Sequence, residues 1–140
     1  MVKRRRIIRR SGLEDNIEAQ LKTTKTYYEY EPKEGKISYT VPESYHKYCP
    51  DFIIKTKSGK EIIIEGKGIW DNDDRKKHLL IRQQHPNLDI RFVFSRSKAR
   101  IRKGSKTTYA DICEGKGRSP YKGIVWQYSD KLIPPAWLRE

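Results

Sequence analysis

The sequence is poor in cysteine, has no long apolar segment and is short of acidic residues. Its two cysteines, Cys49 and Cys113, have a spacing that matches no zinc or thiol-redox motif. We expect two reduced thiols, as is usual in the cytosol. No apolar run approaches the roughly 18 residues that cross a bilayer, and the N-terminus lacks the apolar core of a signal peptide. These absences argue against a disulfide-stabilised secreted domain and a membrane-spanning protein, and they predict a cytoplasmic location.

Acidic residues are outnumbered, because 31 lysines and arginines stand against 18 aspartates and glutamates and give a net charge of +13. Such a charge repels itself in a compact fold, so we expect a polyanionic partner. Nucleic acid is the first candidate. An anionic membrane surface is the second, but the chain has no long basic helix with a continuous apolar face. A length of 140 residues is typical of one domain with a single core.

The pattern of apolar residues and turns predicts a mixed sheet with helices packed against it. Residues 1–10 carry six basic residues and no acid, and we interpret them as a flexible basic arm before one domain over 11–140. Ser11 and Glu14 are spaced as a helix capping box. Residues 42–50, between two prolines, are expected to be an irregular link, and the basic stretch 96–106 an exposed loop. The expected helices cover 11–24, 71–86 and 107–117, and the expected strands cover 26–31, 37–41, 51–57, 60–68, 89–95 and 123–128.

Two apolar runs flank Ser58-Gly59 and predict a β-hairpin that gathers charged residues at its open end. With a turn at 58–59, Asp51 falls opposite residue 66, next to Glu65 and Lys67. Side chains alternate along a strand, so Glu65 and Lys67 share a face. Two carboxylates this close raise one another's pKa unless a cation lies between them. The hairpin therefore predicts one cluster of two acids and a lysine.

Oxygen ligands with open water positions suit Mg²⁺, and such a site suits phosphodiester hydrolysis. The metal would polarise the phosphoryl oxygen and lower the pKa of a bound water, while Lys67 would balance developing negative charge. The alternative is that Asp51 and Glu65 form only surface ion pairs with Lys67, which contribute about 0–1 kcal/mol when exposed. The basic surroundings favour a metal-dependent nuclease.

At these residues the chain resembles the PD-(D/E)xK nucleases and, more closely, the phage endonuclease I family of Holliday-junction resolvases. The motif appears as "PDF" at 50–52 and "EGKG" at 65–68. Further matching pieces are "RSGLED" (10–15), "YEYE" (28–31), "YCPDF" (48–52), the long block 65–95, "KGS" (103–105) and "DKLIPPAW" (130–137). The family more often has a hydroxyl residue where this chain has Gly66, and the segments "PKEGK" and "RSPYKGIVWQYS" are longer than expected.

The resemblance implies a restriction-endonuclease-like α/β core in an intertwined homodimer, with residues 32–50 as the bridge between subunits. Each active site would then be composite, with Asp51, Glu65 and Lys67 from one chain and Glu14 from the other. Glu14, Asp51, Glu65 and the carbonyl of Gly66 would bind Mg²⁺, for which Mn²⁺ can substitute. Glu29 matches a further acidic position of the family, although an exposed strand residue is an equal alternative.

The implied function is a metal-dependent, structure-selective DNA endonuclease that resolves four-way junctions and other branched double-stranded DNA, in the host cytoplasm if a phage encodes it. It needs no small-molecule cofactor. A non-catalytic junction-binding architectural protein and a sequence-specific restriction-type enzyme are the alternatives. His78 and His85 are interpreted as surface residues, whereas His46 lies in the link before Asp51, from which it could approach a phosphate. The expected phosphate contacts are Arg4, Arg5, Arg6, Arg96, Arg100, Arg102 and Lys103.

Overall fold

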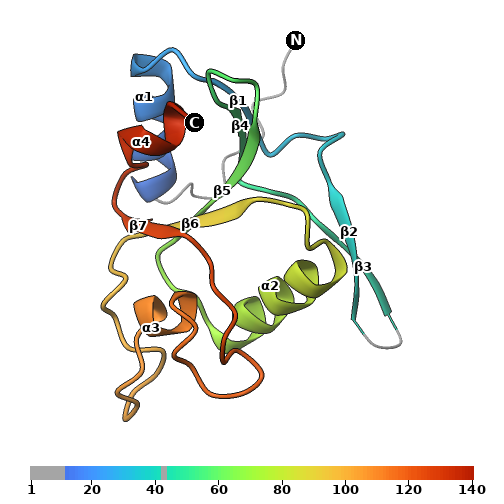
Figure 1. Cartoon of the computed structure of the whole chain (residues 1–140), viewed down its shortest axis with the longest axis vertical. Helices are drawn as coiled ribbons and strands as arrows, with labels where there is room; N and C mark the ends of the chain where they lie inside the picture. The colour runs from blue at the N-terminus through green and yellow to red at the C-terminus, as the bar shows by residue number, and fades with distance from the viewer. Residues whose placement is uncertain (1–11, 42–43) are drawn as a thin grey trace.

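A computed structural model describes residues 12–41 and 44–140 and shows one mixed five-stranded sheet (Figure 1). The strands are β1 (Tyr27–Tyr30), β4 (Phe52–Lys55), β5 (Glu61–Lys67), β6 (Ile90–Phe94) and β7 (Tyr128–Asp130), in the order β1-β4-β5-β6-β7. The pairs β1–β4 and β4–β5 are antiparallel, whereas β5–β6 and β6–β7 are parallel. The expected mixed sheet is confirmed.

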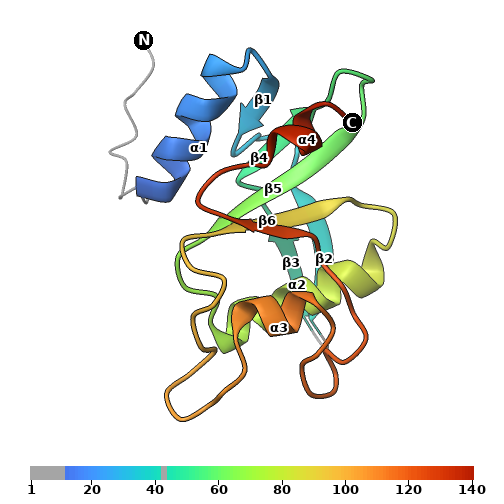
Figure 2. The same ribbon diagram turned by 60° about the vertical axis from the view of Figure 1, so that its left-hand side comes forward.

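Helices cover both faces of the sheet, as the two ribbon views agree (Figures 1 and 2). On one face lie α1 (Gly12–Thr23) and α4 (Pro135–Leu138), which bury Leu13, Ile17 and Leu21 of α1 against even-numbered residues of β4 and β5. On the other face lie α2 (Asn72–Gln84) and α3 (Tyr109–Cys113), packed around Trp70. The strict alternation of a strand therefore divides the apolar residues of β5 between two cores.

The segment from β5 through α2 to β6 is a β-α-β unit, which explains why β5 and β6 are parallel. Asp71 caps α2, because its carboxylate accepts a hydrogen bond of 2.9 Å from the amide of Asp74. The predicted helix over 71–86 is thus confirmed within one or two residues. Its first turn follows directly after the open end of the hairpin.

The link expected over 42–50 is wrong in part, since β3 (Ser44–Tyr48) pairs with β2 (Ile37–Val41) as an antiparallel ribbon outside the main sheet. The composition of β3 is polar and gives little strand signal, so its conformation comes from pairing with β2. Figure 1 shows the ribbon running past α2 at the side of the molecule. Gln84 at the end of α2 holds the ribbon by two hydrogen bonds to the backbone of Thr40.

Two further boundaries differ from the sequence prediction. The hairpin turn spans three residues, because Thr56 and Lys60 still pair and Gly59 adopts a φ of 87°. The register accordingly moves by one, so that Phe52 lies opposite Ile64 and Asp51 comes beside Glu65. The strand expected over 123–128 begins only at Tyr128, since the preceding residues bond instead to the end of α3.

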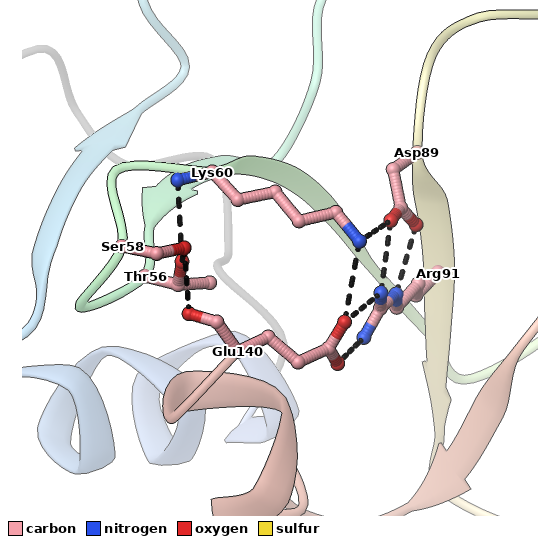
Figure 3. Close-up of polar contacts among 6 residues, drawn as sticks. All are labelled: Thr56, Ser58, Lys60, Asp89, Arg91 and Glu140. Atoms are coloured by element: carbon pink, nitrogen blue, oxygen red, sulfur yellow. Dashed lines mark hydrogen bonds and ion pairs between the residues drawn. The ribbon is translucent and has the colours of Figure 1, made fainter.

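A cluster of charged side chains joins the end of the chain to the sheet (Figure 3). The guanidinium of Arg91 is only 1% exposed and donates to both oxygens of Asp89 and both oxygens of Glu140. Lys60 lies 3.0 Å from Asp89 and 3.2 Å from Glu140. The carbonyl of Glu140 also accepts a hydrogen bond from the Ser58 hydroxyl. The cluster fixes the hairpin turn and β6 to Glu140, two residues after α4.

Both cysteines are free thiols, as expected. Within the described ranges, no helix combines the length and apolar character that a membrane crossing requires.

Candidate active site

Asp51 and Glu65 meet at the open end of the hairpin, where the backbone amides of Asp51 and Gly66 hold their carboxylates. The Asp51 amide donates a 2.7 Å hydrogen bond to Glu65 Oε2, and the Gly66 amide donates a 3.0 Å hydrogen bond to Asp51 Oδ2. Glu65 is 2% exposed. Backbone amides from both sides of the hairpin therefore fix the two carboxylates at one place.

The two carboxyl groups differ in how readily they ionise. Burial, followed by the charges of Glu65 and Glu14, raises the pKa of Asp51 to about 8. Burial also opposes the ionisation of Glu65, but His78, Lys67 and the Asp51 amide outweigh it and lower the pKa of Glu65 to about 2. Glu65 therefore carries the charge near neutral pH, and Asp51 ionises fully only when further positive charge arrives.

Lys67 is the buried cation of the site. Its ammonium lies 2.7 Å from Asp74 Oδ2 and 3.6 Å from Glu65 Oε1, with 11% of the side chain exposed. Burial works against the charged form, but Glu65 and Asp74 outweigh it and raise the pKa of Lys67. Lys67 is thus protonated and fixed in position. Asp74 was missed in the sequence because it falls in the helix first turn, where an acid already stabilises the helix.

His78 is not a surface residue, so that interpretation of the sequence is wrong. It is 1% exposed, and its Nε2 lies 3.4 Å from Glu65 Oε1. Tyr48 and Phe92 pack edge-on against the imidazole, with ring centroids 5.3 and 4.9 Å away. Burial lowers the pKa of His78, so the ring is neutral at pH 7. The residues Arg75, His78, Leu79 and Ile81 form the buried face of α2, which the many charges of this helix conceal in the sequence.

Helix α1 of the same chain closes the other side of the site. Glu14 lies near enough to raise the pKa of Asp51, and Glu14 Oε2 accepts a 2.5 Å hydrogen bond from the Tyr30 hydroxyl. A side chain at Gly66 would place its Cβ 3.3 Å from Ile17 and 3.5 Å from Leu13. The close approach of α1 explains a glycine at this position. The sequence did not indicate Tyr30 as a site residue, although the alternation of side chains along "YEYE" places Tyr30 and Glu29 on opposite faces of the strand.

Glu29 points elsewhere on β1. It is exposed and accepts a 2.8 Å hydrogen bond from the Tyr27 hydroxyl. Its role in the site stays a prediction.

The expected phosphate contacts fall into two groups. Arg96, Arg100, Arg102 and Lys103 are all exposed on the irregular stretch that follows β6, which confirms the exposed loop. Arg4, Arg5 and Arg6, with the rest of the basic arm and the capping residue Ser11, lie outside the described residues.

The donor set of the site suits a hydrated hard cation. Asp51 and Glu65 supply carboxylate oxygens, and burial followed by the negative charges of Glu65 and Glu14 raises the pKa of Asp51. Among residues 12–41 and 44–140, no three histidine, cysteine, aspartate or glutamate side chains are arranged as a complete metal-binding group. Mg²⁺ is commonly held by one or two carboxylates and keeps several waters, so the two carboxylates fit that ion better than a closed zinc site.

Comparisons with known proteins define the class of the chain. It is 47% identical over 131 residues to "Endonuclease I" of Escherichia phage T7, a match that covers 94% of this chain and 78% of the relative. It is 49% identical over 131 residues to "Endodeoxyribonuclease 1" of Enterobacteria phage T3, covering 94% and 77%. Both relatives are named as nucleases.

The family description "Phage endonuclease I" matches residues 2–140. The chain belongs to the phage endonuclease I family, as the resemblance in its motifs implied.

Proposed function

We propose that the protein is a Mg²⁺-dependent endonuclease that resolves four-way DNA junctions by phosphodiester hydrolysis. The observation that carries the proposal is the pair Asp51 and Glu65, which the backbone amides of Asp51 and Gly66 hold together while the pKa of Asp51 is raised. The two relatives named as an endonuclease and an endodeoxyribonuclease support DNA as the substrate. A phage nuclease that processes branched DNA in recombination would act in the host cytoplasm.

The side chains around the pair have separate roles. Asp51 and Glu65, with Glu14 and the Gly66 carbonyl, would hold Mg²⁺ or Mn²⁺. When bound, the ion polarises a phosphoryl oxygen and lowers the pKa of a water molecule. Lys67 presents a fixed positive charge to the reacting phosphate.

Two residues of α2 support these groups without touching substrate. Asp74 holds the Lys67 ammonium at 2.7 Å. Neutral His78 packs against Glu65 and keeps the carboxylate in place. Such supporting groups hold a reactive set in the geometry that the reaction needs.

Selectivity would come from the shape of the junction rather than from base edges. The exposed arginines and lysine of residues 96–106, together with the basic arm, would contact phosphates of the duplex arms. Affinity should consequently fall steeply with salt.

We also propose that two chains form an intertwined homodimer with a restriction-endonuclease-like core. In an exchanged dimer, the contacts of Leu13 and Ile17 over Gly66 are made by α1 of the other chain, and Glu14 moves with that helix. Residues 32–50, which include the ribbon of β2 and β3, would form the bridge. Tyr45 on this ribbon is 92% exposed.

Cleavage of a labelled four-way junction and of its linear duplex, with Mg²⁺ and with chelator, tests the activity. The wild type should cut only the junction and only with metal. Glu65→Gln and Lys67→Ala should lose cleavage and retain junction binding. A chain that binds the junction but leaves it whole under all these conditions would instead be an architectural protein, and cutting of linear duplex would indicate a restriction-type enzyme.

Complementation tests the composite site. Inactive Glu14→Gln and Asp51→Asn chains are unfolded together and refolded as a mixture. If sites are composite, each mixed dimer has one site with native Glu14 and native Asp51, so nicking of one junction strand should return. If both residues of a site come from the same chain, every site lacks one carboxylate and the mixture stays inactive.

A further inference from the structure

A second charged cavity lies beyond the carboxylate site, between the first turn of α2, residues 101–107 and residues 118–121. We call it the basic pocket. Its volume is about 570 Å³, and the cations Arg75, Arg102, Lys106 and Arg118 line it. No aspartate or glutamate of the described ranges is among its lining residues. Four residues with a formal positive charge therefore line one hollow, and no acid of the described ranges lines it.

Arg75 is the strongest sign that the basic pocket is built for an anion. It is 3% exposed, and the hydrogen bond recorded for its guanidinium within the described chain is a 2.5 Å bond to the Trp70 carbonyl. A guanidinium has five donors, and a buried cation without a counter-charge is unfavourable. Among the described residues, no carboxylate forms an ion pair with Arg75. An anion in the pocket would supply both the charge and the acceptors.

Tyr121 gives an independent sign. Tyr121 lines the basic pocket, and its buried hydroxyl has no hydrogen-bond partner in the part of the chain that the structure describes. Buried polar groups are almost always hydrogen-bonded, so this hydroxyl is suited to donate to a ligand. Ser105 and Thr107, which both carry a hydroxyl, line the same cavity.

We propose that the basic pocket binds a backbone phosphate of the DNA substrate, at a distance along the duplex from the phosphate that is cut. The anion site follows from the cavity itself, whereas its assignment to DNA rests on the proposed function. A phosphate is the ligand that several arginines and hydroxyls recognise together. Ile101 and Ile112 form apolar wall next to the cations and suit the sugars on either side of that phosphate.

The first turn of α2 connects the basic pocket to the candidate active site. Asn72 and Arg75 line the pocket, whereas Asp74 holds Lys67. At 100° per residue, Asn72 and Arg75 lie about 60° apart around the helix and Asp74 about 160° from Asn72. The same rigid turn thus faces both sites, so a phosphate held in the pocket would set the position of the duplex relative to Lys67.

The first test is anion binding to the full-length, metal-free protein. Inorganic phosphate is titrated at constant ionic strength while the backbone amide shifts of Gly104, Ser105 and Thr107 are followed by NMR. The wild type should show saturable shifts, and Lys106→Gln/Arg118→Gln should lose them. Lys98→Gln/Lys122→Gln is the matched control, because it removes the same charge from exposed positions outside the pocket lining and should keep the shifts.

The second test is junction binding by the same variants in chelator over a series of salt concentrations. Loss of one phosphate contact should lower affinity about tenfold at moderate salt and reduce the slope of log affinity against log salt by about 1. The control should lose about twofold or less. The proposal is overturned if phosphate causes no saturable shift, or if both double variants lose equal affinity. An uncut junction in Mg²⁺ with the phosphate shifts intact would overturn the proposed function and leave the anion site supported.

Discussion

The Asp51 carboxyl should make the metal-free protein less stable as the pH rises. Its folded pKa of about 8 lies above its ordinary value of 3.8, so the folded state keeps a proton that the unfolded state loses. The contribution of Asp51 to the free energy of unfolding is therefore highest below about pH 4, and it falls as the pH rises towards 8. Asp51→Asn removes the ionisation and should stabilise the metal-free protein at pH 8 while abolishing cleavage.

The magnitude follows from the difference between the two pKa values. At about 1.4 kcal/mol per pH unit, this pKa difference corresponds to a loss of about 6 kcal/mol in the free energy of unfolding by pH 8. Between pH 5 and pH 8 the same pKa difference corresponds to a loss of about 4 kcal/mol. Glu65 acts in the opposite direction, because its folded pKa of about 2 lies below 4.5. Its contribution is complete above about pH 4.5 and does not mask the decline at higher pH.

Urea unfolding in chelator at pH 5, 6, 7 and 8 measures this effect. The wild type should lose about 4 kcal/mol over the series relative to Asp51→Asn, with equal dependence on urea. Glu34→Gln, an exposed acid far along the chain from the site, is the control and should follow the wild type. If Asp51→Asn follows the wild type at every pH, the charge repulsion assigned to the site is absent and the reasoning fails.

Three further outcomes are expected. His78→Gln should lower the cleavage rate about 10- to 100-fold with junction affinity unchanged, because changing a residue that holds a metal-binding group typically has an effect of this size. Equal cleavage rates for the wild type and the variant would contradict the role of His78 beside Glu65. Arg91→Met should lower the free energy of unfolding by about 3 kcal/mol, because it leaves Asp89 and Glu140 without their buried partner. A urea titration measures this change, and a value below about 1 kcal/mol would contradict the importance of the cluster. Mg²⁺ at 100 times its dissociation constant should stabilise the wild type by about 2.7 kcal/mol but not Asp51→Asn, a difference that thermal unfolding can measure.

The carboxylate cluster could be predicted from sequence because it depends on local rules. A hairpin brings residues on either side of its turn together, and strand alternation puts Glu65 and Lys67 on one face. Only the register was off by one, since Gly59 with positive φ allows a three-residue turn where the sequence suggested two. The apolar residues of α1, spaced four apart, likewise gave the helix and its buried face.

The rest of the site depends on packing between distant segments. His78 and Asp74 reach Glu65 and Lys67 only because α2 folds back across the sheet. A polar side chain in a highly charged helix gives no local sign that it is buried. Strand β3 was missed for a similar reason, because its pairing with β2 gives it a strand conformation that its own residues do not favour. The basic pocket also joins three separate segments of the chain.

The measurement that tests the central claim most directly is the number of protons released when Mg²⁺ binds. Calorimetric titration in two buffers of different ionisation enthalpy gives this number at each pH. Because Asp51 has a pKa of about 8 and must ionise to bind the cation, close to one proton should be released at pH 7 and almost none above pH 9. Binding without proton release at pH 7, or unchanged binding by Asp51→Asn, would contradict the claim that Asp51 and Glu65 together hold the cation.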